Sequence, residues 1–301
     1  MLRREGALAG AMAVCAGRQN KRLAGSSRGV RRQRYLHRPV HETTPSVHLI
    51  ARPQVDLDGM RAYLEDVGGA SWLERRIEEE DGSPNAGELL VEFGGRACYR
   101  SWEPGLNVNV TRVRTDRREY FENLLRSAHG SVLEHASYSF ALRNVSRVFT
   151  HELVRHRAGS AFSQESLRYV RLTDIGFRVP PALEPLRGQV LAIVEQLEEF
   201  QRDAAATLKL DDEGVPFHVK KEATSALRRL APIGLSTDII WSANLRTLRH
   251  VIEMRTADGA EEELRTVFDD VARVMLREAP LLFQDFERAD DGTWKPRFHK
   301  V

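Results

Sequence analysis

Residues 155–169 read Arg-His-Arg-Ala-Gly-Ser-Ala-Phe-Ser-Gln-Glu-Ser-Leu-Arg-Tyr, and the interpretation of the whole chain starts from this stretch. It places three arginines, a histidine, three serines, an amide and a carboxylate within fifteen positions. A packed core absorbs so many polar groups only where each has an internal partner, because a buried unpaired group costs about 1–3 kcal/mol. Such a density favours recognition of a phosphate together with a heteroaromatic ring.

Two interpretations of this stretch carry about equal weight on composition alone. In the first, its three arginines hold a nucleotide phosphate, while Gln164 and Glu165 offer donors and acceptors to the edge of a base. In the second, the arginines form a structural network of ion pairs with Glu134, Glu152 and Glu165. Composition leaves the choice between them open.

The positive charge of the chain is concentrated near its N-terminus. The formal net charge of the 301 residues is +2, but residues 1–40 hold ten Lys or Arg and one acid, Glu5, for a charge of +9. The other 261 residues therefore carry −7. This net negative charge over residues 41–301 argues against broad electrostatic binding of nucleic acid. We expect a small-molecule partner, and neither nucleic acid nor membrane.

The first 45 residues are rich in Arg, Ala, Gly and Ser and lack helical or strand periodicity beyond a short apolar patch at 7–16. We expect a disordered basic extension over 1–45, followed by a single domain over 46–301. A secretory signal is less favoured, because Glu5 interrupts its charged start. No apolar run approaches the roughly 18–20 residues that cross a bilayer. Two cysteines without a CxxC spacing suit a reducing cytoplasm.

Hydrophobic periodicity predicts an α+β fold. Helical spacing predicts helices over 59–67, 86–99, 116–128, 147–156, 188–208, 220–230, 244–255 and 260–278. Alternation predicts strands over 136–142 and 236–241, with an extended segment over 167–172. Residues 155–169 would then begin on a helix end and continue into a loop that contains Gly159.

Other common chemistries fit the sequence poorly. It contains no Walker A loop, no GxGxxG after a strand, no HExxH and no GxSxG. Four histidines, at 129, 135, 151 and 156, could suggest a metal site, but His151 and His156 fall on different sides of a helix, and we expect no metal. We interpret Cys98 as a small buried hydrophobe rather than a nucleophile, since no base or cationic cluster is adjacent.

The chain also resembles a known protein family. Arg155-His156-Arg157, a spacer, and then Ser166 and Arg168-Tyr169 resemble the signature of the flavin-dependent thymidylate synthases (ThyX), usually RHR, seven residues and Ser. Here the spacer is eight residues, and the extra one is placed near Ala161. Further segments also resemble the family over about residues 86–285: Ser131–His135, His151–Val154, Ala226–Pro232, Asn244–Leu248 and Arg255. The chain departs from it at His250, where the family often has Asn, and at Ala260–Glu263.

The resemblance implies a particular fold and reaction. It implies an α+β domain, a central mixed or antiparallel sheet flanked by helices, assembled as a homotetramer with each active site shared between subunits. It implies C5-methylation of a uridine monophosphate, dUMP to dTMP. 5,10-Methylenetetrahydrofolate would donate the carbon and FAD reduced by NADPH the hydride. Such an enzyme needs no cysteine nucleophile.

The resemblance also assigns roles to residues by position. FAD contacts would come from Ser137, Arg155, His156, Arg157, Asn244, Arg246 and His250. The nucleotide would be held by Glu152, Arg155, Gln164, Glu165, Ser166, Arg168, Arg228 and Arg255. Among these, Arg168 and Arg228 would hold the phosphate. Arg255 would stabilise negative charge on the uracil ring and is the expected catalytic residue.

Two further functions remain open from the sequence. The lengthened spacer passes beside the expected sugar site, so a related enzyme could methylate UMP, the ribonucleotide, as in nucleoside-antibiotic biosynthesis. A non-enzymatic nucleotide- or nucleic-acid-binding protein would instead draw on the basic N-terminal extension.

Overall fold

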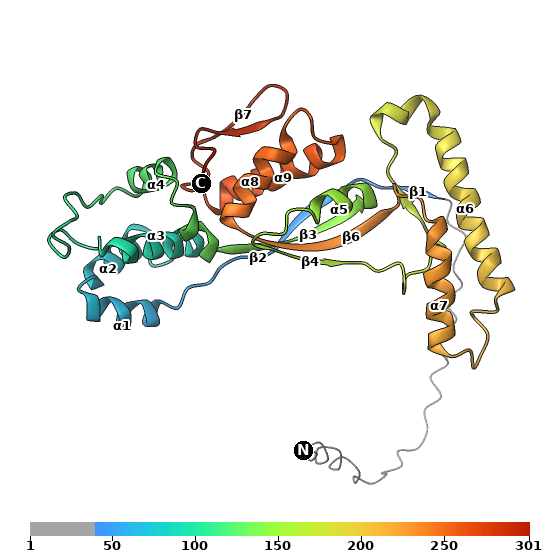
Figure 1. The fold of residues 1–301 in the computed structure, drawn as a ribbon, viewed down its shortest axis with the longest axis horizontal. Helices are drawn as coiled ribbons and strands as arrows, with labels where there is room; N and C mark the ends of the chain where they lie inside the picture. Colours follow the sequence, from blue (N-terminus) through green and yellow to red (C-terminus); the bar gives the residue numbers. More distant parts are fainter. Residues whose placement is uncertain (1–39) are drawn as a thin grey trace, which may run out of the picture. The chain divides into compact units, whose positions relative to one another are not determined.

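The computed structural model describes residues 40–301 (Figure 1). Positions 1–39 of the predicted extension over 1–45 lie outside the described residues. After it, strand β1 (His41–Glu42) pairs in parallel with β5 (Gly176–Phe177). Ordered pairing therefore begins before the boundary that we predicted at residue 45, because these two residues gain a partner strand that is remote in sequence.

The centre of the fold is a four-stranded antiparallel sheet in the order β2-β3-β6-β4. Its strands are β2 (Ser46–Ala51), β3 (Ser137–Ser146), β6 (Ser236–Asn244) and β4 (Ser160–Gln164). The predicted strands at 136–142 and 236–241 are confirmed and are longer than expected. The register of β3 on β6 shifts between Leu142 and Val145, and there the Asn144 amide donates to Asp238 at 2.9 Å.

Helices cover one face of this sheet. In Figure 1, α5 (Arg147–Leu153), α8 (Leu245–Thr256) and α9 (Glu262–Glu278) lie on the same side of it. Alternate residues of the strands point into this layer, where Trp241 packs edge-on against Phe268 at 5.5 Å and lies 5.9 Å from Phe140. The other face carries partly exposed Ile240 among small or polar side chains such as Ser139 and Ser242, whose hydroxyls lie 2.7 Å apart.

The predicted helix starts are confirmed where a polar side chain can cap the first turn. Side-chain oxygens of Asn85, Asp116, Ser146 and Asn244 each accept a hydrogen bond from the amide three residues later. These caps begin α3 (Ala86–Tyr99), α4 (Arg117–Arg126), α5 and α8. Cys98, near the end of α3, is exposed, so its predicted burial is wrong: the last turn of α3 leaves its side chain on the surface.

The N-terminal helices form a separate small core around an ion cluster. Helices α1 (Leu57–Val67), α2 (Ala70–Glu79) and α3 pack around Leu64, Trp72 and Trp102, all buried. The buried carboxylate of Glu92 accepts hydrogen bonds from Trp72, Arg76 and Arg96 on one oxygen, at 2.8–3.2 Å. These donors satisfy the buried carboxylate and join α2 to α3 within this small core.

Three local predictions in and around the central stretch are wrong. The helix over 147–156 ends at Leu153, and the following residues form a turn that reaches Gly159 in the left-handed region (φ 65°). The stretch then continues as strand β4 rather than as a loop, because its backbone pairs with β6 residue by residue from Ser160 to Gln164. Residues 167–172 form turns instead of the predicted extended segment.

Ala161, beside which the extra spacer residue is predicted, lies within the regular β4–β6 ladder, where it pairs with Ser242 without a bulge.

The remaining described elements are three short 3₁₀ helices, two α-helices and a small hairpin. They are η1 (Gly130–His135), η2 (Pro181–Leu186), α6 (Arg187–Thr207), α7 (Phe217–Leu227), η3 (Arg228–Leu230), β7 (Phe286–Arg288) and β8 (Trp294–Pro296). The predicted apolar face of α6 is only partly buried, since Ile193 is 58% and Phe200 46% exposed. No helix among the described residues is both long and apolar enough to cross a membrane.

Candidate active site

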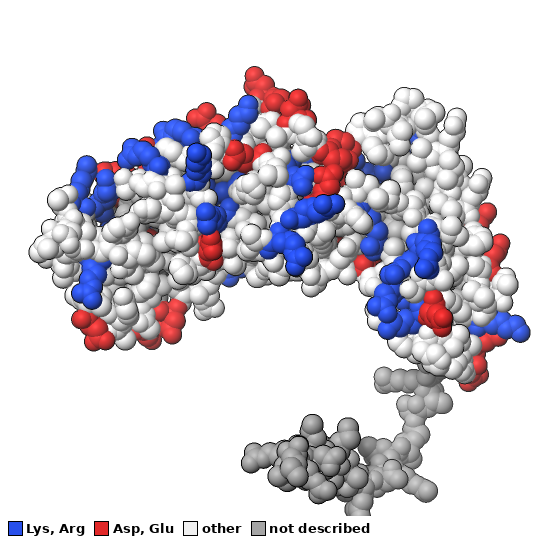
Figure 2. Space-filling view, in the orientation of Figure 1, with Lys and Arg blue, Asp and Glu red and all other residues white. Residues whose placement is uncertain are grey.

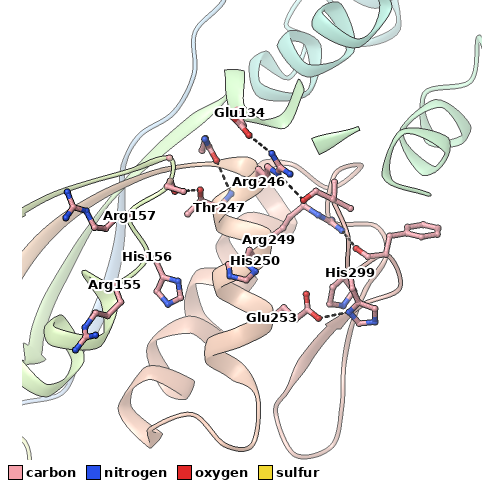
Figure 3. Close-up of a pocket in the computed structure, with 16 residues that line it drawn as sticks. Glu134, Arg155, His156, Arg157, Arg246, Thr247, Arg249, His250, Glu253 and His299 are labelled. Carbon is pink, nitrogen blue, oxygen red and sulfur yellow. Dashed lines mark hydrogen bonds and ion pairs between the residues drawn. The ribbon is translucent and has the colours of Figure 1, made fainter. Parts of the chain in front are cut away.

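A pocket of about 550 Å³ opens beside the N-terminal half of α8 (Figure 3). We call it the α8 pocket. Three segments far apart in the sequence form its walls: the turn at 155–159, helix α8 with its cap, and residues 296–301. Its lining residues are Glu134, Arg155, His156, Arg157, Ala158, Gly159, Asn244, Arg246, Thr247, Arg249, His250, Glu253, Pro296, Phe298, His299 and Val301.

Helix spacing aligns the polar residues of α8. Arg246, His250 and Glu253 lie four and three residues apart, so they share one face of the helix. The turn that follows α5 is fastened to this helix start, because Thr247 Oγ1 donates to the Ala158 carbonyl at 2.7 Å. Each part of the pocket wall is thereby held by backbone as well as by side-chain contacts.

Gly159 permits the close approach of this turn to α8. A Cβ atom at this position would lie 2.3 Å from Asn244 Nδ2 and 2.6 Å from Thr247 Oγ1. Its backbone also lies in the left-handed region, which side chains disfavour. The Asn244 amide donates to the Gly159 carbonyl at 3.0 Å, which closes the turn onto the cap of α8.

The arginines of residues 155–169 are not absorbed by a structural network. Within residues 40–301, the guanidinium groups of Arg155 and Arg157 form no ion pair or hydrogen bond. The acids that could have neutralised them bond elsewhere: Glu134 accepts from Arg246 at 2.6 Å and Glu152 from Arg255 at 2.6 Å. The arrangement favours anion binding over the ion-pair interpretation of this stretch.

Arg255 links His156, in the central stretch, to Glu152, in the preceding helix α5. Its Nε donates to His156 Nε2 at 2.8 Å, and its Nη1 donates to Glu152 Oε2 at 2.6 Å. Partial burial, together with the positive charge of Arg255, lowers the pKa of His156 from 6.5 to about 4. His156 is therefore neutral at pH 7, and its proton resides on Nδ1 because Nε2 accepts from Arg255.

A second hollow, of about 410 Å³, lies beyond the end of β4, and we call it the β4 pocket. Its lining residues are Arg147, Gln164, Glu165, Ser166, Leu167, Arg228 and Arg229. Arg147 donates to the Glu165 carbonyl at 2.9 Å, while its buried Nε has no partner among the described residues. Burial lowers the pKa of this guanidinium, with Arg228 adding like-charge repulsion. Three arginines beside a serine hydroxyl suit a phosphate.

The structure therefore places ten of the fourteen predicted site residues in two pockets and leaves four outside both, namely Ser137, Glu152, Arg168 and Arg255. Six of the seven predicted flavin contacts line the α8 pocket, and four predicted nucleotide contacts, Gln164, Glu165, Ser166 and Arg228, line the β4 pocket. Ser137 lies opposite Asn244 in the sheet but does not line the α8 pocket. Arg168 is exposed beside Tyr169 and lines neither pocket. The two pockets have no lining residue in common.

Sequence reasoning missed several lining residues. Arg147 at the start of α5 and Arg229 next to Arg228 had a signal, since both are arginines adjoining predicted site segments. Glu253 had a weaker signal, its position on the same helix face as His250. The C-terminal residues Phe298 and His299 had none, because only the folded chain brings them to α8. Within residues 40–301 no group of three or more His, Cys, Asp or Glu is arranged to hold a metal.

Comparison with known proteins identifies the class of protein to which this fold and site belong. Residues 83–281 match the family described as thymidylate synthase complementing protein, so the chain belongs to that family. This membership confirms the resemblance to flavin-dependent thymidylate synthases.

Two sequence relatives agree with the family match. The chain is 38% identical over 220 residues to a flavin-dependent thymidylate synthase of Mycolicibacterium gilvum, and the matched region covers 69% of this chain and 84% of the relative. It is 37% identical over 208 residues to one of Mycobacterium marinum, with 67% and 81% covered. Among solved structures, thymidylate synthase X of Helicobacter pylori with FAD and dUMP superimposes with a TM-score of 0.47 at 19% identity, covering 66% of this chain and 93% of that chain.

Proposed function

We infer that this chain is a flavin-dependent thymidylate synthase, which methylates carbon 5 of dUMP to give dTMP. 5,10-Methylenetetrahydrofolate supplies the one-carbon unit, and FAD reduced by NADPH supplies the hydride. Family membership and the relatives named for this activity support the inference. The structural observation that carries it is the convergence of Arg155, His156 and Arg157 with Asn244, Arg246 and His250 on one pocket.

The α8 pocket fits a flavin dinucleotide. Such a cofactor needs cations for its diphosphate and apolar surface for its rings. Arg155 and Arg157 offer guanidinium groups without partners among the described residues, and Pro296 and Phe298 offer apolar surface. We propose that these residues hold FAD, together with His156, Asn244, Arg246 and His250 and with Ser137 at the adjoining end of β3.

The β4 pocket suits the phosphate of dUMP. We propose that Arg228 and Ser166 hold this phosphate and that Gln164 and Glu165 contact the nucleoside. We also assign to the nucleotide Arg168, which lines neither pocket, and Arg155, which lines the α8 pocket. Arg147 joins this set, since its buried Nε needs an acceptor. We expect Arg147→Ala to raise the KM for dUMP about tenfold or more without changing FAD binding.

We propose that Arg255 acts at the uracil ring. Three of its five N–H groups point to His156 and Glu152, which leaves two for the imide of the base. A fixed cation there stabilises negative charge that develops on the ring and so increases the nucleophilicity of carbon 5. Glu152 and His156 hold the guanidinium plane in place, and neutral His156 adds no competing charge.

We further propose a homotetramer whose active sites lie between subunits. Three observations support it: the two pockets share no lining residue, the second face of the central sheet bears small polar side chains, and Ile193 and Phe200 are exposed on α6. Light scattering coupled to size-exclusion chromatography tests the assembly, and a monomer that is active at assay concentration would contradict it.

A small-molecule partner, without nucleic acid or membrane, and a cytoplasmic location complete the proposal. Figure 2 shows Lys and Arg interspersed with Asp and Glu on the visible face, rather than gathered into one broad basic surface. The UMP methylase and the non-enzymatic binding protein are not favoured, since the relatives are named thymidylate synthases.

The decisive experiment combines spectroscopy and turnover. Purified protein should show the absorbance of an oxidised flavin, and should form dTMP from dUMP when methylenetetrahydrofolate and NADPH are supplied. UMP assayed in parallel serves as the matched substrate control. A colourless protein that cannot be reconstituted with FAD would rule out the proposed function.

A further inference from the structure

The C-terminal segment supplies one wall of the α8 pocket. Residues Pro296, Phe298, His299 and Val301 line it, and Figure 3 shows His299 across the pocket from Arg155, His156 and Arg157. The family match ends at residue 281, so this wall comes from a part of the chain beyond the matched region. The pocket therefore has a component that family membership alone does not describe.

The part of this segment around Phe298 is held against α8 through Asp285. Buried Arg249 on α8 donates to both carboxylate oxygens of Asp285, at 2.8 and 2.9 Å. The same carboxylate accepts from the Phe298 amide at 3.2 Å. Two-point pairing of a buried guanidinium fixes both distance and orientation, so Phe298 is held at a defined position against α8.

The tip, residues His299–Val301, touches the polar face of α8 directly. His299 Nδ1 lies 2.5 Å from Glu253 Oε1, and the Val301 carbonyl accepts from Arg246 Nε at 3.2 Å. The backbone also passes close to η1, where a Cβ on Gly130 would lie 2.6 Å from the Val301 carbonyl carbon. A ligand that contacts Arg246 on this face therefore lies beside the tip.

The pairing of His299 leaves one ring nitrogen for a ligand. Glu253 orients the imidazole through Nδ1, so Nε2 remains available for a further hydrogen bond. The His299 side chain is 62% exposed, and an exposed side-chain pair of this kind contributes little to stability by itself. The pair is thus placed to act on a bound molecule more than on the fold.

We propose that residues His299–Val301 form part of the flavin-nucleotide site, in which His299, oriented by Glu253, is an additional binding residue that slows release of the cofactor. This inference rests on the proposed function, because it takes FAD as the occupant of the α8 pocket. His299 contributes a hydrogen bond to a polar group of the dinucleotide, and the tip shields the cofactor from solvent.

The test measures FAD binding to the apoprotein by flavin fluorescence, at equilibrium and after dilution. His299→Ala and Glu253→Ala should weaken binding about five- to tenfold, mainly through faster dissociation, which corresponds to the loss of one hydrogen bond. Arg297→Ala is the matched control, since Arg297 belongs to the same segment but pairs with Glu122 and does not line the pocket. It should bind FAD within twofold of the wild type.

Hydrogen–deuterium exchange of the wild-type protein gives an independent measurement. Amides of residues 298–301 should exchange more slowly when FAD is bound. Unchanged or faster exchange, or wild-type FAD affinity in His299→Ala, would overturn this inference while the proposed function stands. A wild-type protein that binds no FAD would overturn both.

Discussion

Replacing Arg255 by alanine removes the guanidinium that joins Glu152 to His156. The variant loses the hydrogen bonds of 2.6 Å to Glu152 and 2.8 Å to His156, and it removes the cation assigned to the uracil ring. Arg255→Lys is the informative companion, because it retains the charge but not the planar fork that reaches both partners.

The structure separates the expected effects on stability and turnover. Glu152 is partly exposed and can regain water, so the stability loss should be about 1 kcal/mol. Loss of a preorganised donor at a site of developing charge should lower kcat about 10²- to 10³-fold, which corresponds to about 2.7–4 kcal/mol. Arg255→Lys should lie between the wild type and Arg255→Ala.

The assay follows dTMP formation at saturating dUMP, with flavin absorbance measured on the same samples. Arg255 does not line the α8 pocket, so both variants should retain flavin. The pKa of His156 should rise in Arg255→Ala, because the positive charge of Arg255 is one cause of its depression. An NMR titration of the imidazole measures this change independently of turnover.

Arg265→Ala provides a matched control, since it removes an arginine whose ion pair with Asp258 lies outside both pockets. It should turn over like the wild type. If Arg255→Ala retained flavin and a kcat within threefold of the wild type, the role assigned to Arg255 would be refuted.

Three further predictions follow from particular contacts. The pKa of His156 is about 4 in the folded protein and about 6.5 when unfolded, so the unfolded state binds more protons between these values and stability falls as pH drops through this window. The loss should be about 1–2 kcal/mol after allowing for solvent screening, and His156→Gln should abolish it in urea unfolding followed from pH 7 to 4.5. Gly159→Ala should lower stability by about 2 kcal/mol or more and weaken FAD binding, because its Cβ meets Asn244; Gly214→Ala, also at positive φ but in open space, should show only the backbone cost of about 1 kcal/mol in thermal unfolding. Arg249→Leu should destabilise the fold by about 3–5 kcal/mol by leaving a buried carboxylate unpaired, and adding Asp285→Leu should recover most of this loss in denaturant titration; an equally unstable double variant would contradict the argument.

Much of the fold could be predicted because its signals are local. Helix caps such as Asp116 and Ser146 act within one turn, and strand alternation acts within a few residues, so the predicted helices and strands were mostly confirmed. Errors arose where a remote partner decides the conformation. Strand β4 forms because β6 offers a free edge to pair with, and no periodicity within residues 160–164 specifies that edge.

The candidate site shows the same division. The sequence by itself determined the residue types, from the three arginines of residues 155–169 to Asn244 and Arg246, because their identities and spacing carry the family signature. Only the tertiary structure decided how these residues are divided between two pockets and that Arg255 bonds to His156. It alone brought His299 to the pocket wall. Some of these contacts join residues about a hundred positions apart, such as Arg255 and His156, and packing of the whole chain fixes their distances.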